Sequence, residues 1–344
     1  MGIFSKIFAS GKGGEEETAA EPAAKDMFTS ITLQLQGELE RALQSYLRLG
    51  EEQPDDTLAP FFAASVMTAM GDVDGGAERL RDLSRLVAER GENISRAVAG
   101  ALFTLLTEEP GIDVPALGET LVAFGDRLKQ AGFARESAVC FEIAAGVMPE
   151  HSQVLHRLGD TLHDLGLYEY AEAVLKKSLE YAPNHWDSLY TYGVLLQDLG
   201  RLEEAIPCYE RAVAINPDHV KCRNNFGAAL MLSGRVEEAM EQCTRAAELD
   251  PAFPLAKVNL GNLQMLRKEY DTARSYFSEA ISLDENLAPA YFGLGAVEQC
   301  CGGGVEKIRG LYARAVELSP NNPQFREALA SLPAEGEAAD TRLG

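Results

Sequence analysis

Apolar side chains recur at helical spacing through most of the chain. Within residues 186–219 a first stripe advances by steps of three and four: Leu189, Tyr192, Leu196 and Leu199. A matching stripe follows it: Ala205, Tyr209 and Ala212. Apolar residues three or four positions apart share one face of an α-helix. The pattern therefore predicts two consecutive amphipathic helices, each of which must bury its stripe against another helix.

A period of 34 residues runs through the middle of the chain, and three columns of residues show it. One column is proline: Pro149, Pro183, Pro217 and Pro251. Another is glycine: Gly125, Gly159, Gly193, Gly227, Gly261 and Gly295. The third holds small residues: Ala144, Ser178, Ala212, Ala246 and Ala280. Three columns with one shared period indicate a repeat architecture.

This period and pattern resemble the tetratricopeptide repeat family, whose unit is two antiparallel helices and a turn. Glycine at position 8 lets two helix backbones approach closely, and glycine at position 15 suits the left-handed residue after a helix end. Proline at position 32 ends the second helix. The repeats predict six units: 118–151, 152–185, 186–219, 220–253, 254–287 and 288–322. The resemblance implies an all-α, right-handed superhelical solenoid of stacked antiparallel helix pairs, because one pair cannot bury both stripes.

Outside the six units the sequence predicts four more segments. They are a flexible N-terminal tail (1–26), a degenerate repeat-like helical region (27–117), a capping helix (323–332) and a disordered C-terminal tail (333–344). The helical region keeps part of the repeat pattern, at Gly37, Ala42, Tyr46 and Pro54. We expect it to continue the solenoid, and a separate helical bundle is the alternative.

Charge and composition narrow the classes of function. The chain has 344 residues, with 31 Lys and Arg against 53 Asp and Glu, for a net charge of −22. Binding to duplex nucleic acid needs cations that displace phosphate counterions, so this balance disfavours nucleic acid and broad attachment to anionic membranes. The longest mostly apolar stretch, residues 58–70, is shorter than the roughly 20 residues that span a bilayer. Six cysteines are too few for a disulfide scaffold, which predicts a soluble protein of the reducing cytoplasm.

Residues 1–12 combine apolar and basic side chains. On a helix four apolar residues would share one face: Ile3, Phe4, Ile7 and Phe8. Lys6 and Lys12 accompany them, and no acidic residue precedes Glu15. Such a segment is typical of a short anchor to a membrane surface or a partner's groove, so we expect membrane contact only here, which would make the protein peripheral at a membrane. The alternative is a frayed terminus with incidental apolar residues.

No motif predicts catalysis, a cofactor or a metal. Residues 11–13 lack the upstream glycine and the following hydroxyl residue of a phosphate loop. His151, His185 and His219 all occupy position 34, so stacked units would separate them by about 8–10 Å per helix layer, whereas zinc–nitrogen bonds are about 2 Å long. No nucleophile, base and orienting group can be assembled. We therefore expect a non-enzyme without cofactor or metal.

The family resemblance implies a partner-binding surface on the first helix of each unit, where positions 2, 5, 6, 9, 12 and 13 usually face the concave groove. Carried over by position, it indicates Arg157, Tyr190, Lys221, Asn224, Asn225, Val258, Asn259, Asn262 and Phe292. An amide offers both a donor and an acceptor, so Asn225 and Asn259 could hold a peptide backbone, as the asparagine row of some family members does. The alternative is that these amides cap local backbone or bind water.

The expected groove changes character along the chain. Its first half is polar: His156, Asp160, His163, Asp164 and Asp198. Its second half is apolar: Met231, Leu232, Val258, Met265, Leu266 and Phe292. Methionine and leucine suit an apolar or amphipathic helix, and Lys221 with Arg223 adds a small basic island compatible with an acidic or carboxylate-ended peptide. The alternative is that several of these residues contact the neighbouring unit instead.

Together these features predict a non-catalytic scaffold or adaptor that binds a peptide or helix of another protein in the concave groove. A first alternative is a substrate-recruiting subunit of a separately encoded enzyme, such as a glycosyltransferase, because some glycosyltransferases carry an asparagine-lined repeat array. A second is a membrane-apposed assembly factor tethered through residues 1–12. The sequence leaves the partner and the oligomeric state open.

Overall fold

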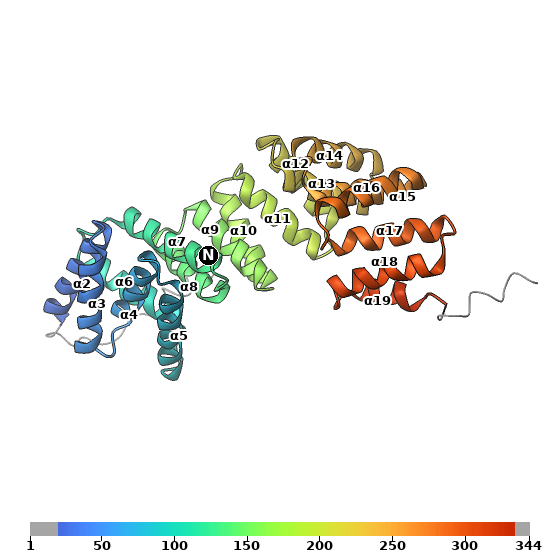
Figure 1. Cartoon of the computed structure of the whole chain (residues 1–344). Helices are drawn as coiled ribbons and strands as arrows, with labels where there is room; N and C mark the ends of the chain where they lie inside the picture. Colours follow the sequence, from blue (N-terminus) through green and yellow to red (C-terminus); the bar gives the residue numbers. More distant parts are fainter. Residues whose placement is uncertain (1–19, 334–344) are drawn as a thin grey trace, which may run out of the picture. The chain divides into compact units, whose positions relative to one another are not determined.

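The computed structural model describes residues 20–333, and every regular element in this part of the chain is an α-helix (Figure 1). The predicted anchor at residues 1–12 lies outside these residues, as does the predicted tail beyond residue 333. The contacts divide the chain into two compact units, the first ending at Thr191 and the second beginning at Tyr192. The fold is thus an all-α array of helices, as the repeat pattern predicts.

The first unit runs from α2 to the start of α11. Its helices are α2 (Ala20–Leu35), α3 (Leu39–Glu52), α4 (Leu58–Ala69), α5 (Val73–Glu89), α6 (Ile94–Glu108), α7 (Val114–Gln130), α8 (Ala134–Val147), α9 (Ser152–Asp164), α10 (Tyr168–Tyr181) and α11 (Trp186–Asp198). Helix α2 begins inside the segment expected to be a flexible tail. The prediction of a tail is therefore wrong for residues 20–26, which belong to this helix. The alanines of its first turns have the highest helix propensity of any residue.

Most of these helices pack as sequential pairs, namely α2 with α3, α4 with α5, α7 with α8, and α9 with α10. Helix α6 departs from this pairing, because it packs mainly against α8. Helix α7 instead contacts α4, as first helices of successive pairs do. We propose that residues 27–117 continue the repeat array and that α6 is an insertion within it.

The second unit begins within α11 and repeats the same pairing. Its further helices are α12 (Leu202–Ile215), α13 (Val220–Leu232), α14 (Val236–Leu249), α15 (Pro254–Leu266), α16 (Tyr270–Leu283), α17 (Ala288–Cys300), α18 (Val305–Leu318) and α19 (Pro323–Ala330). Helix α19 packs against α18, where Phe325 is buried beside Ala315. First helices α13, α15 and α17 lie next to one another, so residues at equal repeat positions on them are neighbours.

The glycine column at position 8 provides room for a large side chain of the paired helix. A Cβ built on Gly261 would lie 2.7 Å from Cε1 of Phe277, and one on Gly193 would lie 2.8 Å from Cε1 of Tyr209. Phe277 and Tyr209 are fully buried. In four of the six repeat units an aromatic ring thus packs against a bare helix backbone, whereas Leu175 and Cys243 fill this place opposite Gly159 and Gly227.

The glycine column at position 15 ends the first helix of each pair in the left-handed region. The glycines with positive φ at this position are Gly132, Gly166, Gly200, Gly234 and Gly302. Lys268 takes the same position after α15 with a φ of 63°, a conformation that costs an L-residue about 1–2 kcal/mol. The unit geometry is thus kept even where the sequence lacks glycine.

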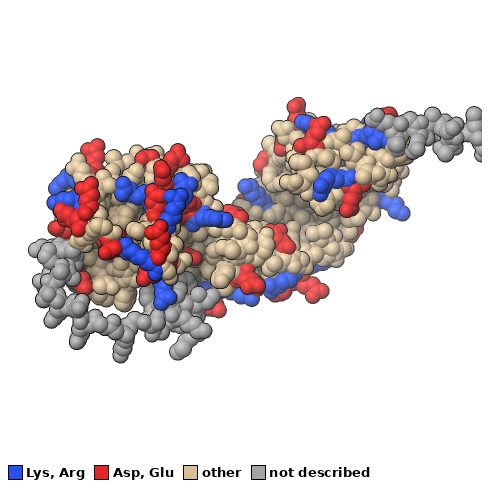
Figure 2. All heavy atoms as spheres, turned by 90° about the horizontal axis from the view of Figure 1, so that it is seen from below, with Lys and Arg blue, Asp and Glu red and all other residues tan. Residues whose placement is uncertain are grey.

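Acidic and basic side chains are interspersed on the face of the molecule in Figure 2, without a broad basic area. Among residues 20–333 no helix combines the length and the apolar character needed to cross a bilayer.

Candidate partner-binding surface

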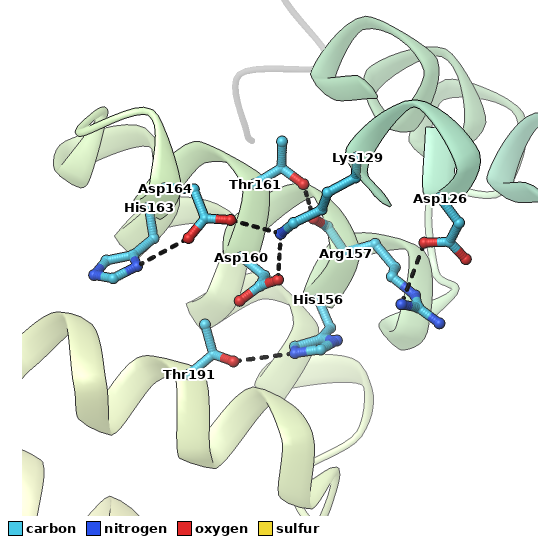
Figure 3. A network of polar contacts seen from close by, with 9 residues as sticks. All are labelled: Asp126, Lys129, His156, Arg157, Asp160, Thr161, His163, Asp164 and Thr191. Carbon is cyan, nitrogen blue, oxygen red and sulfur yellow. Dashed lines mark hydrogen bonds and ion pairs between the residues drawn. The ribbon is translucent and has the colours of Figure 1, made fainter. Parts of the chain in front are cut away.

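Charged side chains from successive first helices meet in a polar network in the first unit (Figure 3). Lys129 on α7 points between two carboxylates of α9, and its Nζ lies 2.5 Å from Oδ2 of Asp160 and 2.8 Å from Oδ2 of Asp164. Burial lowers the pKa of Lys129, but its hydrogen bonds to the two carboxylates outweigh this and the pKa is raised. Lys129 is therefore a fixed cation that ties α7 to α9.

Arg157 of α9, a predicted site residue, reaches back to α7. Its Nη1 lies 3.2 Å from Oδ1 of Asp126. Burial raises the pKa of Asp126, although Arg157 and Lys129 both act to lower it. The Nε of Arg157 is buried and has no hydrogen-bond partner among the described residues. One guanidinium nitrogen is thus held by the fold, while the side chain of Arg157 as a whole stays 39% exposed.

His156 links α9 to α11 in the same network (Figure 3). Its Nε2 lies 3.1 Å from Oγ1 of Thr191, and its ring centroid is 5.6 Å from that of His185. Burial lowers the pKa of His156 to about 4. The imidazole is consequently neutral at pH 7 and adds no charge to this surface.

The histidine row of position 34 lies at helix starts. Nδ1 of His219 accepts a hydrogen bond from the backbone N–H of Cys222 at 3.0 Å. Nδ1 of His185 accepts one from the N–H of Ser188 at 3.3 Å. These are N-cap interactions, which satisfy the first free amides of a helix. Within residues 20–333 no group of three His, Cys, Asp or Glu residues is placed so that it could hold a metal ion.

The predicted amide pair of the second unit is arranged differently from the expectation. Asn259 on α15 donates from Nδ2 to Oδ1 of Asn224 on α13 at 2.8 Å. Asn224 is only 4% exposed. The prediction that its side chain contacts a partner is therefore wrong. The residue at position 5 of one 34-residue repeat therefore packs against the residue at position 6 of the next repeat, just as His156 packs against Thr191. Asn225 is half-buried and its Oδ1 lies 3.4 Å from Nδ2 of Asn224.

Two further predicted residues belong to the packing between successive 34-residue repeats. Val258 is 4% exposed in a core cluster with Phe277. Phe292 is half-buried, and its ring centroid lies 4.8 Å from that of Phe325 on α19 and 5.4 Å from that of Tyr312 on α18. Both are removed from the candidate surface, because position 5 points toward the next first helix.

The remaining predicted residues lie at or near the surface. Lys221 is exposed, and Tyr190, Asn225, Asn259 and Asn262 are half-buried. Arg223 does not join Lys221 in a basic island, because its guanidinium bonds to the carbonyl of Pro217 and to Gln242 on α14. Arg223 keeps its positive charge, but these two acceptors hold its guanidinium in place.

The most exposed apolar side chains of the second unit's first helices are Leu232 and Leu266, at 62% and 58%. They occupy position 13, as the last residues of the neighbouring helices α13 and α15. Partly buried neighbours on the same helices are Asn225, Ala228, Met231, Asn262 and Met265. We call these seven residues the Leu232/Leu266 surface. At positions 2, 5, 6, 9, 12 and 13 of α13, α15 and α17 there is no Asp or Glu, although the chain carries 53 of them.

Sequence reasoning missed Lys129 and did not predict its ion pairs with Asp160 and Asp164. The signal was present in the repeat register. Lys129 occupies position 12 of its unit, and Asp160 and Asp164 occupy positions 9 and 13 of the next. Side chains at these positions of adjacent first helices lie within reach once the helices stack. A search for opposite charges at this offset would have found the network.

Comparison with known protein families identifies the repeats in the middle of the chain. Tetratricopeptide repeat models match residues 150–218, 190–252 and 229–288. The chain is a tetratricopeptide repeat protein. Such proteins are generally non-catalytic scaffolds for interactions between proteins. No curated protein matches this tetratricopeptide repeat chain by sequence.

Solved structures are similar to this tetratricopeptide repeat protein in fold. PilF of Pseudomonas aeruginosa is 17% identical with a TM-score of 0.54, over 64% of this chain and 99% of that one. PilW, described as a type IV pilus biogenesis factor, is 18% identical with a TM-score of 0.55, over 62% of this chain and 98% of that one. MamA of Desulfovibrio magneticus RS-1 is 23% identical with a TM-score of 0.46, over 51% of this chain and 98% of that one. At these sequence identities the likeness concerns the fold alone.

Proposed function

We propose that the protein is a non-catalytic scaffold that holds an apolar or amphipathic segment of a partner protein on the Leu232/Leu266 surface. The observation that carries the proposal is the pair of leucines, each more than half exposed, on adjacent helices. Exposed apolar side chains that lie next to one another mark interaction sites more often than scattered ones do. A helix with anchors at three- and four-residue spacing can fill such a surface.

The absence of carboxylates from this surface supports the same proposal. The chain carries a net charge of −22, so the lack of Asp and Glu at these positions of α13, α15 and α17 distinguishes this part of the molecule from the rest. Desolvating a carboxylate costs free energy, and this surface can be covered without that cost. Met231 and Met265 add flexible side chains that adapt to the shape of a ligand.

Asn262 can add a polar contact at the edge of this surface. It is half-buried, and its amide offers both a donor and an acceptor. Asn259 contributes less, because its Nδ2 is already bonded to Asn224. The partner is therefore held mainly through apolar side chains, with amide contacts orienting its backbone.

The experiment compares two double variants of the intact protein as bait in a native lysate. Leu232→Ser/Leu266→Ser removes the proposed anchors. Ile215→Ser/Leu283→Ser is the matched control, because these residues are 42% and 43% exposed and also end helices of the second unit. We expect the first variant to capture at least tenfold less of a partner that the control retains, as measured by quantitative mass spectrometry. The Kd of the purified partner for each variant then checks the difference. Equal retention by both variants contradicts the proposal.

The other two functions that the sequence suggested remain hypotheses. A substrate-recruiting subunit would need an enzyme activity that appears only when this chain and its partner are combined. A membrane-apposed assembly factor would need residues 1–12 for sedimentation with membranes. Neither has a specific observation among residues 20–333 in its favour.

A further inference from the structure

A cleft of about 670 Å³ opens between α3 and α5, over α4. Its apolar lining residues are Leu47, Pro60, Met67, Leu83 and Leu86. Leu86 is 37% exposed and Met67 is half-buried. Helices α3 and α5 are the second helices of successive pairs, so this cleft is distinct from the Leu232/Leu266 surface. A strip of apolar side chains between two helices is typical of a site for an amphipathic helix.

Acidic side chains border this cleft on both sides. Glu51 on α3 and Glu78 on α5 are exposed lining residues, and neither forms an ion pair with any residue that the structure describes. Asp82 lines the same wall but lies 2.7 Å from Arg85. Arg79 is the cation among the lining residues. The cleft therefore favours a ligand with an apolar face and a positive charge.

We propose that residues 1–12 of the same chain occupy this cleft. They carry four apolar residues that would share one helix face, together with Lys6 and Lys12 and no acid. On a helix Lys6 would lie outside the face of these apolar residues, so its long side chain would reach toward the acidic border while they meet the floor. Apolar and charge complementarity together are what an amphipathic segment in a groove requires.

The start of the described chain lies toward the end of α3 that borders this cleft. Helix α2 packs antiparallel on α3, since Ser30 Oγ lies 2.7 Å from Ser45 Oγ and Asp26 Oδ2 lies 3.7 Å from Arg48 Nη2. Followed back toward Ala20, α2 therefore extends past the end of α3, where Glu51 and Pro54 line the cleft. Residues 13–19 can bridge up to about 25 Å when extended.

Two physical reasons favour this occupant over a membrane or a second copy. A segment joined by a short connector meets its site at an effective concentration in the millimolar range. A single short amphipathic segment also binds membranes only marginally, because stable anchoring usually takes two signals. Docked residues 1–12 would cover both their own apolar face and Leu86.

Tryptic cleavage after Lys6 in the intact protein tests the proposal. Glu51→Lys/Glu78→Lys is expected to speed this cleavage at least fivefold, because it reverses the charges that face Lys6. Glu180→Lys/Glu241→Lys is the matched control, since both residues are exposed and lie on α10 and α14. An unchanged rate in the first variant, or an equal increase in the control, overturns the proposal.

Carbodiimide coupling in a mixture of isotopically heavy and light chains identifies the occupant. We expect Lys6 to couple to Glu51 or Glu78 within one chain. Heavy–light products would overturn the proposal in favour of a second copy. Coupling of similar yield to Glu180 and Glu241 would show that the segment does not dock. If this cross-link is lost when vesicles of phosphatidylcholine and phosphatidylglycerol are added, and the protein sediments with them, the proposal is overturned in favour of a membrane.

Discussion

At the residue scale, side chains on successive first helices bond to each other in preference to facing outward. Asn224 is buried and its Oδ1 accepts from Asn259 at 2.8 Å, and His156 meets Thr191 at 3.1 Å. Both pairs join position 5 of one unit to position 6 of the next. A buried polar atom without a partner costs about 1–3 kcal/mol, so these pairs fix the stacking register of neighbouring units.

Replacing Asn259 by Ala should destabilise the second unit by about 1–3 kcal/mol, because it leaves Oδ1 of the buried Asn224 without its donor. Urea unfolding followed by circular dichroism measures the change. Asn262→Ala is the control, because Asn262 is half-buried on the same helix, and it should cost about 0.5 kcal/mol or less. Similar losses in the two variants would contradict this role of Asn259.

The buried imidazole of His156 should make stability depend on pH. Its pKa is about 4 in the folded protein and 6.5 in the unfolded chain. The unfolded chain therefore binds more protons between these values, so stability is complete above about pH 6.5 and falls as the pH drops toward 4. The loss is at most about 3 kcal/mol. His156→Gln should flatten this part of the pH profile of urea unfolding, and an unchanged slope would contradict the assignment.

At the element scale, the helix pairs of the six repeat units each pack a side chain of one helix against a glycine of the other. Gly261 admits the ring of Phe277, and any Cβ would stand 2.7 Å from it. The ring is fully buried, so it cannot move aside without disturbing Val258 and Ala290 in the same cluster. A Cβ on any of the other position-8 glycines would come as close to a side chain of the paired helix, which explains glycine there in all six repeat units.

Gly261→Ala should therefore destabilise the protein by about 1–3 kcal/mol through overpacking. Gly310→Ala is the matched control, because Gly310 is an exposed residue within α18 with nothing within 4 Å of a built Cβ. Alanine favours a helix over glycine by about 0.5–1 kcal/mol, so the control should stabilise. Thermal and urea unfolding of both variants measures these opposite signs, and equal signs would contradict the packing argument.

At the scale of the whole molecule, charge is the dominant feature beyond the repeats. The net charge is −22, and most ion pairs of the described residues are exposed. Exposed pairs contribute about 0–1 kcal/mol each, while a large net charge destabilises a compact state by self-repulsion. Repulsion should therefore outweigh the surface pairs.

Added salt should for this reason raise the melting temperature of the intact protein. The Debye length falls from about 30 Å at 0.01 M to about 10 Å at 0.1 M ionic strength, so the repulsion is screened over this range. Differential scanning fluorimetry from 0.01 to 0.3 M NaCl measures the shift. A melting temperature that falls with salt would show that the ion pairs contribute more than the repulsion.

Much of the fold followed from local features that the sequence displays directly. The 34-residue columns predict the helix pairs, because Gly193 and Gly261 admit aromatic rings and the glycines of position 15 end helices in the left-handed region. Lys268 shows the limit of this reading, since it adopts the same conformation with no glycine to mark it. Helix α6 shows another limit, because its packing against α8 does not follow from the 34-residue columns.

The sequence by itself determined the helix pairs, their period and the acidic character of the chain, because these depend on the order of residues within about 34 positions. Only the tertiary structure decided which first-helix side chains remain available. Asn224, Val258 and Phe292 share position 5 and pack within the array, whereas Leu232 and Leu266 at position 13 stay exposed. Helix periodicity places a residue on one side of its own helix, but burial depends on how closely the next helix packs over that side.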